Sequence, residues 1–289
     1  MEIKHEYSDE AALAQFVQEG YVLYQNVFDP ELISASYRFI FEKYERLKKI
    51  AGEGKIDFDV NGWAVAIMKL YERTDLYEKV IHSKRYVEVM KRFVGPDVAL
   101  LGYDALWINV PKDKDPVLLK GLHTDAWSGT GVNTVFAKLF FTDVDPFNGM
   151  SVCPGSHVQG MIPVRNRAID PRYEVQFETK NMDMCKAGDL LVWHSLLVHS
   201  TTGHSDKNIR ISMTSRFTSI ENQMTTQERG LGYRPLSVGP LNQVLRLVGN
   251  DYLTPFRTLG GYVGVDRRIS DIYNYSRYKQ GVDYEKYLT

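Results

Sequence analysis

Apolar residues in the first hundred positions recur mostly at the three- and four-residue spacing of a helix with one buried face. The second such stretch opens on Asp29-Pro30-Glu31, which supplies a capping side chain, a proline at the first helical position and an acid in the first turn. It runs to about Ala51. Residues 21–27 interrupt the helical pattern with a run rich in Tyr and Val, which predicts a strand. Helix starts are expected at Ser8, Asp29, Thr74 and Ser83.

The pattern changes at Val98, where short β-rich runs separated by turn residues replace the helical spacing. Short strands at such spacing predict an antiparallel sandwich or barrel. No linker composition separates the two regions, so we expect the helices to pack outside the sheets. The expected strands are residues 98–110, 132–144, 150–153, 190–198 and 208–217.

These patterns predict an α+β, mainly β protein in which residues 1–289 form a single domain. Residues 1–97 form its mostly helical part and residues 98–218 its β core. The Tyr-rich segment 219–289 shows little periodicity. We expect it to wrap the body as a lid or to contact a second subunit in a homodimer.

Composition narrows the classes of protein that remain. The chain has 289 residues, a net charge of -1 and no Lys/Arg block longer than three residues, so neither nucleic acid nor a membrane surface is an expected partner. No signal peptide or membrane-spanning run is evident. Two cysteines, Cys153 and Cys185, are too few for a disulfide framework and are expected to be buried thiols. A reducing, cytoplasmic location is the expectation.

The triplet His123-Thr124-Asp125 is the strongest chemical signal in the chain. On an extended backbone its imidazole and carboxylate point to the same side and can hold one face of a metal ion. His199 is the expected third ligand, because two histidines and one carboxylate with open positions form the facial triad of non-haem Fe(II) oxygenases. A second triplet, His204-Ser205-Asp206, has no histidine after it and lies among turn residues, so we interpret it as a solvated turn.

Period-two alternation assigns faces to the two strands that follow. In the strand ending at His199, Trp193 shares the face of His199, whereas His194 points away and is expected to be packed in the protein. In the next strand, Arg210, Ser212, Thr214 and Arg216 share a face. A hairpin placing His199 opposite Arg210 would bring a guanidinium near the metal. The alternative is that this face is exposed and its arginines only solubilise it.

These motifs, in this order, resemble the phytanoyl-CoA dioxygenase family of Fe(II)/2-oxoglutarate oxygenases. The resemblance covers about residues 8–218 and rests on QEGYVLYQNVFDP, HTD, GMSVCPGSH (149–157), Gly188-Asp189-Leu190 leading to His199, and Arg210. It implies a double-stranded β-helix, or cupin-like jelly roll, with the N-terminal helices outside. It also implies that His123, Asp125 and His199 bind Fe(II), that Arg210 and Ser212 bind the distal carboxylate of 2-oxoglutarate, and that Thr201 adds a hydroxyl.

The resemblance further implies a dioxygenase that oxidises an unactivated C–H bond while 2-oxoglutarate and O2 become succinate and CO2. Asp125 argues against the related halogenases, which lack this carboxylate. Lys138 departs from the family, since relatives can carry a tryptophan there. It could contact 2-oxoglutarate, contact an acidic group of the substrate, or extend from an outer sheet face.

The substrate is expected to be a small, polar or anionic metabolite, and an acyl-CoA thioester is the alternative. Trp127 and Trp193 could line its pocket or belong to the core. Polar side chains expected near the mouth are Asn109, Arg165, Arg167, Arg172 and Arg216. Two rival functions use the same ligands: a Zn-dependent cupin-type hydrolase or isomerase, and a non-catalytic jelly-roll binding protein.

Overall fold

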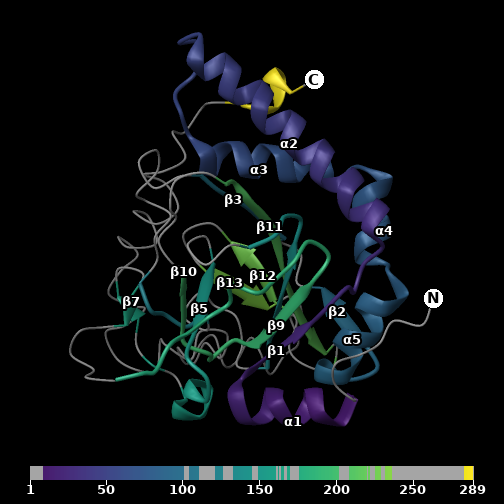
Figure 1. Cartoon of the computed structure of the whole chain (residues 1–289), viewed down its shortest axis with the longest axis vertical. Coiled ribbons are helices and arrows are strands. Elements are labelled where there is room, and N and C mark those ends of the chain that lie inside the picture. The colour runs from purple at the N-terminus through teal and green to yellow at the C-terminus, as the bar shows by residue number, and fades with distance from the viewer. Residues whose placement is uncertain are drawn as a thin grey trace.

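The computed structural model describes residues 9–100, 104–110, 121–125, 133–144, 149–160, 162, 164–165, 168–169, 176–201, 208–219, 221, 225–228, 232–235 and 283–288. Helices surround a core of two β-sheets (Figure 1). They are α1 (Asp9–Glu19), α2 (Pro30–Gly52), α3 (Val60–Tyr71), α4 (Asp75–Ile81) and α5 (Lys84–Val94). In Figure 1, α2 and α3 cross one end of the core and α1 lies at the other.

The predicted helix starts are confirmed where the structure describes them. The Asp29 side chain accepts hydrogen bonds from the first turn of α2, and Thr74 caps α4 in the same way. Helix α3 was not singled out by the sequence. Most of its residues are buried, because it lies between α2 and the β core, so it lacks the polar face that marks an amphipathic helix.

The larger sheet has six strands in the order β1-β9-β4-β11-β2, and β3 also pairs with β11. Its strands are β1 (Tyr21–Tyr24), β2 (Val98–Leu100), β3 (Ala105–Asn109), β4 (Val135–Phe140), β9 (Leu190–His194) and β11 (Arg210–Ser219). The smaller sheet has the order β10-β5-β8, and the strands described in both sheets pair antiparallel. Its strands are β5 (Met150–Val152), β8 (Lys180–Asn181) and β10 (His199–Thr201). Short pairs are β6 (Val164–Arg165) with β7 (Ala168–Ile169), and β12 (Thr225–Glu228) with β13 (Gly232–Pro235).

Three strand predictions are wrong in their extent or pairing. The expected strand 190–198 breaks after β9, where Leu197 N donates to His194 O at 2.9 Å and closes a turn. The chain thereby changes sheets, and His199 begins β10, which pairs with β5 rather than β11. The predicted hairpin between His199 and Arg210 does not form, because β11 pairs with β2, β3 and β4. The run 98–110 is likewise divided into β2 and β3.

The core lies on both faces of the six-stranded sheet. One cluster packs between the sheet and the helices and includes Ile211 and Met213 of β11. The other lies on the opposite face and includes Phe136, Trp193 and Val152, the last of which belongs to the smaller sheet. The alternating faces predicted for β11 are confirmed, and neither of them is a solvent-exposed face.

The end of the chain packs against its own helices. Tyr284 is 6% and Leu288 2% exposed, and both join the helix-side core cluster. The Tyr284 hydroxyl donates to Asp59 at 3.1 Å, and Glu285 pairs with Lys69 at 2.9 Å. Figure 1 shows this short segment, drawn in yellow, beside α2 and α3. The expected lid or dimer contact falls mostly on positions outside the described residues. No helix among the described residues is long and apolar enough to cross a membrane.

Candidate metal centre

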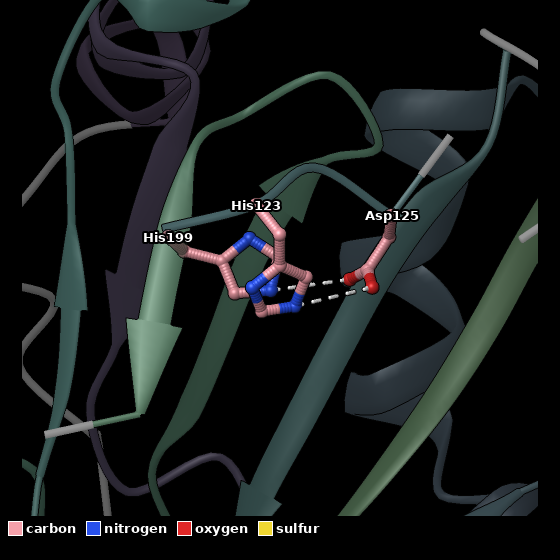
Figure 2. Close-up of side chains that lie close together, drawn as sticks. All are labelled: His123, Asp125 and His199. Carbon is pink, nitrogen blue, oxygen red and sulfur yellow. Dashed lines mark ion pairs between the residues drawn. The ribbon is translucent and has the colours of Figure 1, made fainter. Parts of the chain in front are cut away.

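His123, Asp125 and His199 converge at one end of the jelly roll (Figure 2). The backbones of His123 and His199 exchange two hydrogen bonds of 2.9 Å. These bonds fix the segment that carries His123 and Asp125 against the start of β10. Asp125 Oδ2 lies 3.3 Å from His199 Nε2, and Asp125 Oδ1 lies 3.9 Å from His123 Nε2. One ligand atom from each residue lies within 4.8 Å of the other two, which is close enough for all three to bind one ion.

The hydrogen bonds of the two histidines prepare them for a metal. His123 Nδ1 lies 2.7 Å from Gly121 O, and His199 Nδ1 lies 2.9 Å from Leu197 O. A carbonyl oxygen can only accept, so each Nδ1 carries the proton and each Nε2 keeps its lone pair. Both Nε2 atoms face the Asp125 carboxylate (Figure 2). Histidines that bind a metal usually donate their other ring N–H to a carboxylate, a backbone carbonyl or a water molecule. The two histidines and Asp125 therefore fit a divalent metal ion.

Arg210, in β11, is 2% exposed and lies on the inner face of the larger sheet. Its Nε and Nη2 donate to Asn109 Oδ1 at 3.2 and 2.8 Å, and its Nη1 donates to Gly149 O at 2.5 Å. Asn109 was expected near the mouth of the site. It is instead 6% exposed, directly opposite Arg210 in β3, and it orients the guanidinium. Ser212 is fully buried on the same face.

Lys138, in β4, is 8% exposed and lies on the same strand face as Phe136 and Phe140, which belong to the inner core cluster. Its ammonium is 5.9 Å from the Trp107 ring and 5.8 Å from the Trp193 ring. The alternative that Lys138 extends from an outer face of the sheet is therefore wrong. Sequence reasoning missed Trp107, although its period-two spacing from Asn109 places both on one face of β3.

The other candidates are divided between the site and positions that are not described. The Trp193 ring lies 5.6 Å from that of His199 and stacks on Phe136 at 5.4 Å. The Arg216 guanidinium lies 5.4 Å from the same Phe136 ring. Thr201 is half-buried in β10, two residues after His199. Trp127 lies outside the described residues, as do Arg167, Arg172 and the second H-x-D triplet, and of Arg165 only the backbone is described.

His194, Cys153 and Cys185 are packed in the protein rather than placed for chemistry. The His194 ring lies near Phe16 and His157, and burial, with His157 nearby, lowers its pKa to about 4. Both cysteines are fully buried, as predicted. Burial raises the pKa of Cys153 to about 11 and that of Cys185 to about 12, which keeps both thiols protonated.

A jelly roll that presents two imidazoles and one carboxylate to a single point defines the class of non-haem iron oxygenases. Within that class, the chain belongs to the phytanoyl-CoA dioxygenase (PhyH) family, which it matches over residues 16–212. It is therefore an Fe(II)/2-oxoglutarate-dependent oxygenase. No curated protein matches the sequence significantly.

Solved structures share the fold at low sequence identity. The epimerase SnoN, in complex with Fe3+, alpha ketoglutarate and nogalamycin RO, is 19% identical with a TM-score of 0.59, over 80% of this chain and 94% of that one. The carbocyclase SnoK from nogalamycin biosynthesis is 18% identical with a TM-score of 0.56, over 84% and 91%. HygX from Streptomyces hygroscopicus, with nickel and 2-oxoglutarate bound, is 16% identical with a TM-score of 0.54, over 80% and 98%.

Proposed function

We propose that this protein oxidises an unactivated C–H bond of a small, polar metabolite, while 2-oxoglutarate and O2 are converted to succinate and CO2. The observation that carries the proposal is the convergence of His123 Nε2, His199 Nε2 and the Asp125 carboxylate, with both imidazoles held in the metal-binding tautomer. Family membership supports 2-oxoglutarate as the cosubstrate. The complexes of SnoN and HygX, which contain alpha ketoglutarate and 2-oxoglutarate, support it further.

In this proposal, His123, Asp125 and His199 hold Fe(II) on one face and leave its other positions to ligands. The bound metal, with 2-oxoglutarate and O2, supplies the oxidation, and the chain supplies binding and placement. Asp125 offsets one of the two positive charges of the ion. Its side chain is 16% exposed, compared with 1% for His123, so the opening of the centre lies on the carboxylate side.

Arg210 binds the distal carboxylate of 2-oxoglutarate. Asn109 Oδ1 accepts from Nε and Nη2 and Gly149 O accepts from Nη1, and these bonds fix the plane in which the guanidinium meets a carboxylate. Ser212, on the same face of β11, adds a hydroxyl donor. Thr201, in β10, adds a second hydroxyl near the metal.

The proposal is tested without knowledge of the substrate. Adding Fe(II) and then 2-oxoglutarate to metal-free protein under nitrogen should produce the weak visible charge-transfer band of the chelate. His199→Ala should abolish the band because it removes a ligand. Arg210→Ala should keep the band but require about tenfold or more 2-oxoglutarate, the equivalent of roughly 1.4 kcal/mol.

His82→Ala is the matched control, since the His82 side chain is 72% exposed and far from the ligand set in the sequence. It should behave as the wild type does. If metal binds at His123, Asp125 and His199 but no band forms, the oxygenase proposal is overturned. A Zn-dependent enzyme or a non-catalytic binding protein would then fit the site better.

A further inference from the structure

Side chains on the inner face of the larger sheet differ in burial along β11 and β3. Along β11, Arg210 and Ser212 are 2% and 0% exposed, whereas Arg216 is half-buried. Along β3, Asn109 is 6% exposed and Trp107 is half-buried. Trp107 and Arg216 are therefore the most accessible of these side chains, and a second ligand would reach this face beside them.

Lys138 lies between Arg210 and Arg216 along this face. It is opposite Thr214 in the pairing of β4 with β11, past Ser212 on the way to Arg216. Its ammonium lies 5.9 Å from the Trp107 ring and 5.8 Å from the Trp193 ring. The Trp193 ring in turn lies 5.6 Å from the His199 ring. One indole thus separates this cation from the metal centre.

The neighbours of Lys138 suit an anion attached to an apolar body. Thr214 is 5% exposed, and its hydroxyl has no hydrogen-bond partner among the described residues. An ammonium and a hydroxyl side by side provide the donors that an anionic oxygen group accepts. The indoles of Trp107 and Trp193 offer flat apolar surface beside those donors. Buried polar groups normally have partners, so the Thr214 hydroxyl indicates a polar ligand.

We propose that Lys138 and Thr214 form a subsite for an anionic oxygen group of the substrate, a carboxylate or a phosphate. Trp107 and Trp193 pack against the apolar part of the same substrate. The distal carboxylate of 2-oxoglutarate is bound by Arg210, so the two anions are bound by different cations. This inference rests on the proposed function, because it places the substrate beside the metal.

The test uses protein loaded with Fe(II) and 2-oxoglutarate under nitrogen, and three probes of similar shape. Calorimetric titration compares 3-phenylpropionate and phenyl phosphate with the neutral 3-phenylpropionamide. At least one anion should bind about tenfold or more tightly than the amide. The preferred anion identifies whether the natural group is a carboxylate or a phosphate.

Lys138→Met should abolish the preference for the anion while the 2-oxoglutarate requirement of the visible band stays within about threefold of the wild type. Thr214→Val, which keeps the cation and the side-chain volume, should reduce the preference by a smaller factor. Lys180→Met is the control, because Lys180 also lies near an aromatic ring, that of Tyr21 at 5.7 Å, but on an exposed strand.

Three results would overturn the subsite. One is equal binding of anions and amide by the wild type, and another is no binding of any probe. The third is a Lys138→Met variant that binds 2-oxoglutarate about tenfold more weakly yet still prefers the anion, since Lys138 would then serve the cosubstrate. All three leave the visible band of the wild type intact. If the wild type gives no visible band, the proposed function is contradicted instead of the subsite.

Discussion

At the scale of single residues, the site depends on side chains that orient other side chains. Gly121 O and Leu197 O set the tautomers of His123 and His199, and Asn109 sets the plane of Arg210. Asn109 is suited to this task because an amide oxygen accepts hydrogen bonds without carrying charge. The guanidinium therefore stays positive toward a ligand.

Asn109→Asp tests this role with almost no change in size. The new carboxylate would pair with Arg210 and offset its charge, so we expect the Kd for 2-oxoglutarate to rise about tenfold or more. Asn109→Ser, which is neutral, should weaken binding less. The concentration dependence of the visible band measures both, and thermal unfolding shows whether each variant is folded. An Asp variant that binds 2-oxoglutarate like the wild type would contradict the role.

His194 makes the stability of the protein depend on pH. Burial, followed by the proximity of His157, lowers its pKa to about 4 from the ordinary value of 6.5. Below pH 6.5 the unfolded chain binds this proton more readily than the folded protein does, so stability falls as the pH drops from about 6.5 to about 4. The full shift corresponds to roughly 3–4 kcal/mol.

Urea unfolding of metal-free protein at pH 7 and pH 4.5 measures the effect. Because other histidines also titrate, the comparison is between the wild type and His194→Gln. The variant should lose less stability than the wild type over this interval. An equal loss in both proteins would show that His194 does not contribute.

At the scale of elements, the break between β9 and β10 decides where the distal ligand lies. The turn Pro154–Ser156 helps to hold it, because Val198 N donates to Ser156 Oγ at 2.8 Å and Cys153 N donates to Val198 O at 2.8 Å. These bonds fix the backbone immediately before His199. The GMSVCPGSH motif thus acts on the metal centre through backbone position, and His157 is not a ligand.

Ser156→Ala should destabilise the protein by about 1–3 kcal/mol, because it leaves the buried Val198 N–H without its acceptor. We also expect weaker Fe(II) binding, since His199 would be held less firmly. Ser83→Ala is a suitable control, because Ser83 precedes α5 without a side-chain capping bond. Equal effects of the two substitutions in urea unfolding and metal titration would argue against the role of Ser156.

At the scale of the whole molecule, residues 283–288 pack on the helical layer that the first hundred residues form. Tyr284 packs near Gly62 at the start of α3, and its hydroxyl donates to Asp59, the residue that caps this helix. Helix α3 in turn contacts β3, which carries Asn109 and Trp107. That residues 1–289 form a single domain stays a prediction. The contact of Tyr284 with α3 nevertheless joins residues 283–288 to the helical layer behind the site.

Tyr284→Ala should lower the stability of the protein by roughly 2–4 kcal/mol, because it removes a buried ring from the core cluster. Tyr284→Phe keeps the ring and removes only the bond to Asp59, so it should cost about 1 kcal/mol. Thermal unfolding of the two variants separates packing from hydrogen bonding. If Tyr284→Ala unfolds at the temperature of the wild type, the C-terminal contact is not part of the folded core.

The sequence by itself determined the features that depend on local spacing. The spacing of His123 and Asp125, the starts of helices α2, α4 and α5, and the alternating faces of β11 all follow from neighbouring residues and a fixed backbone period. Only the tertiary structure decided which strands pair. It placed β10 in the smaller sheet, turned Lys138 inward, and moved Asn109 from the expected mouth to Arg210. These features depend on contacts between segments up to about a hundred residues apart, such as Asn109 and Arg210, and no local period encodes such contacts.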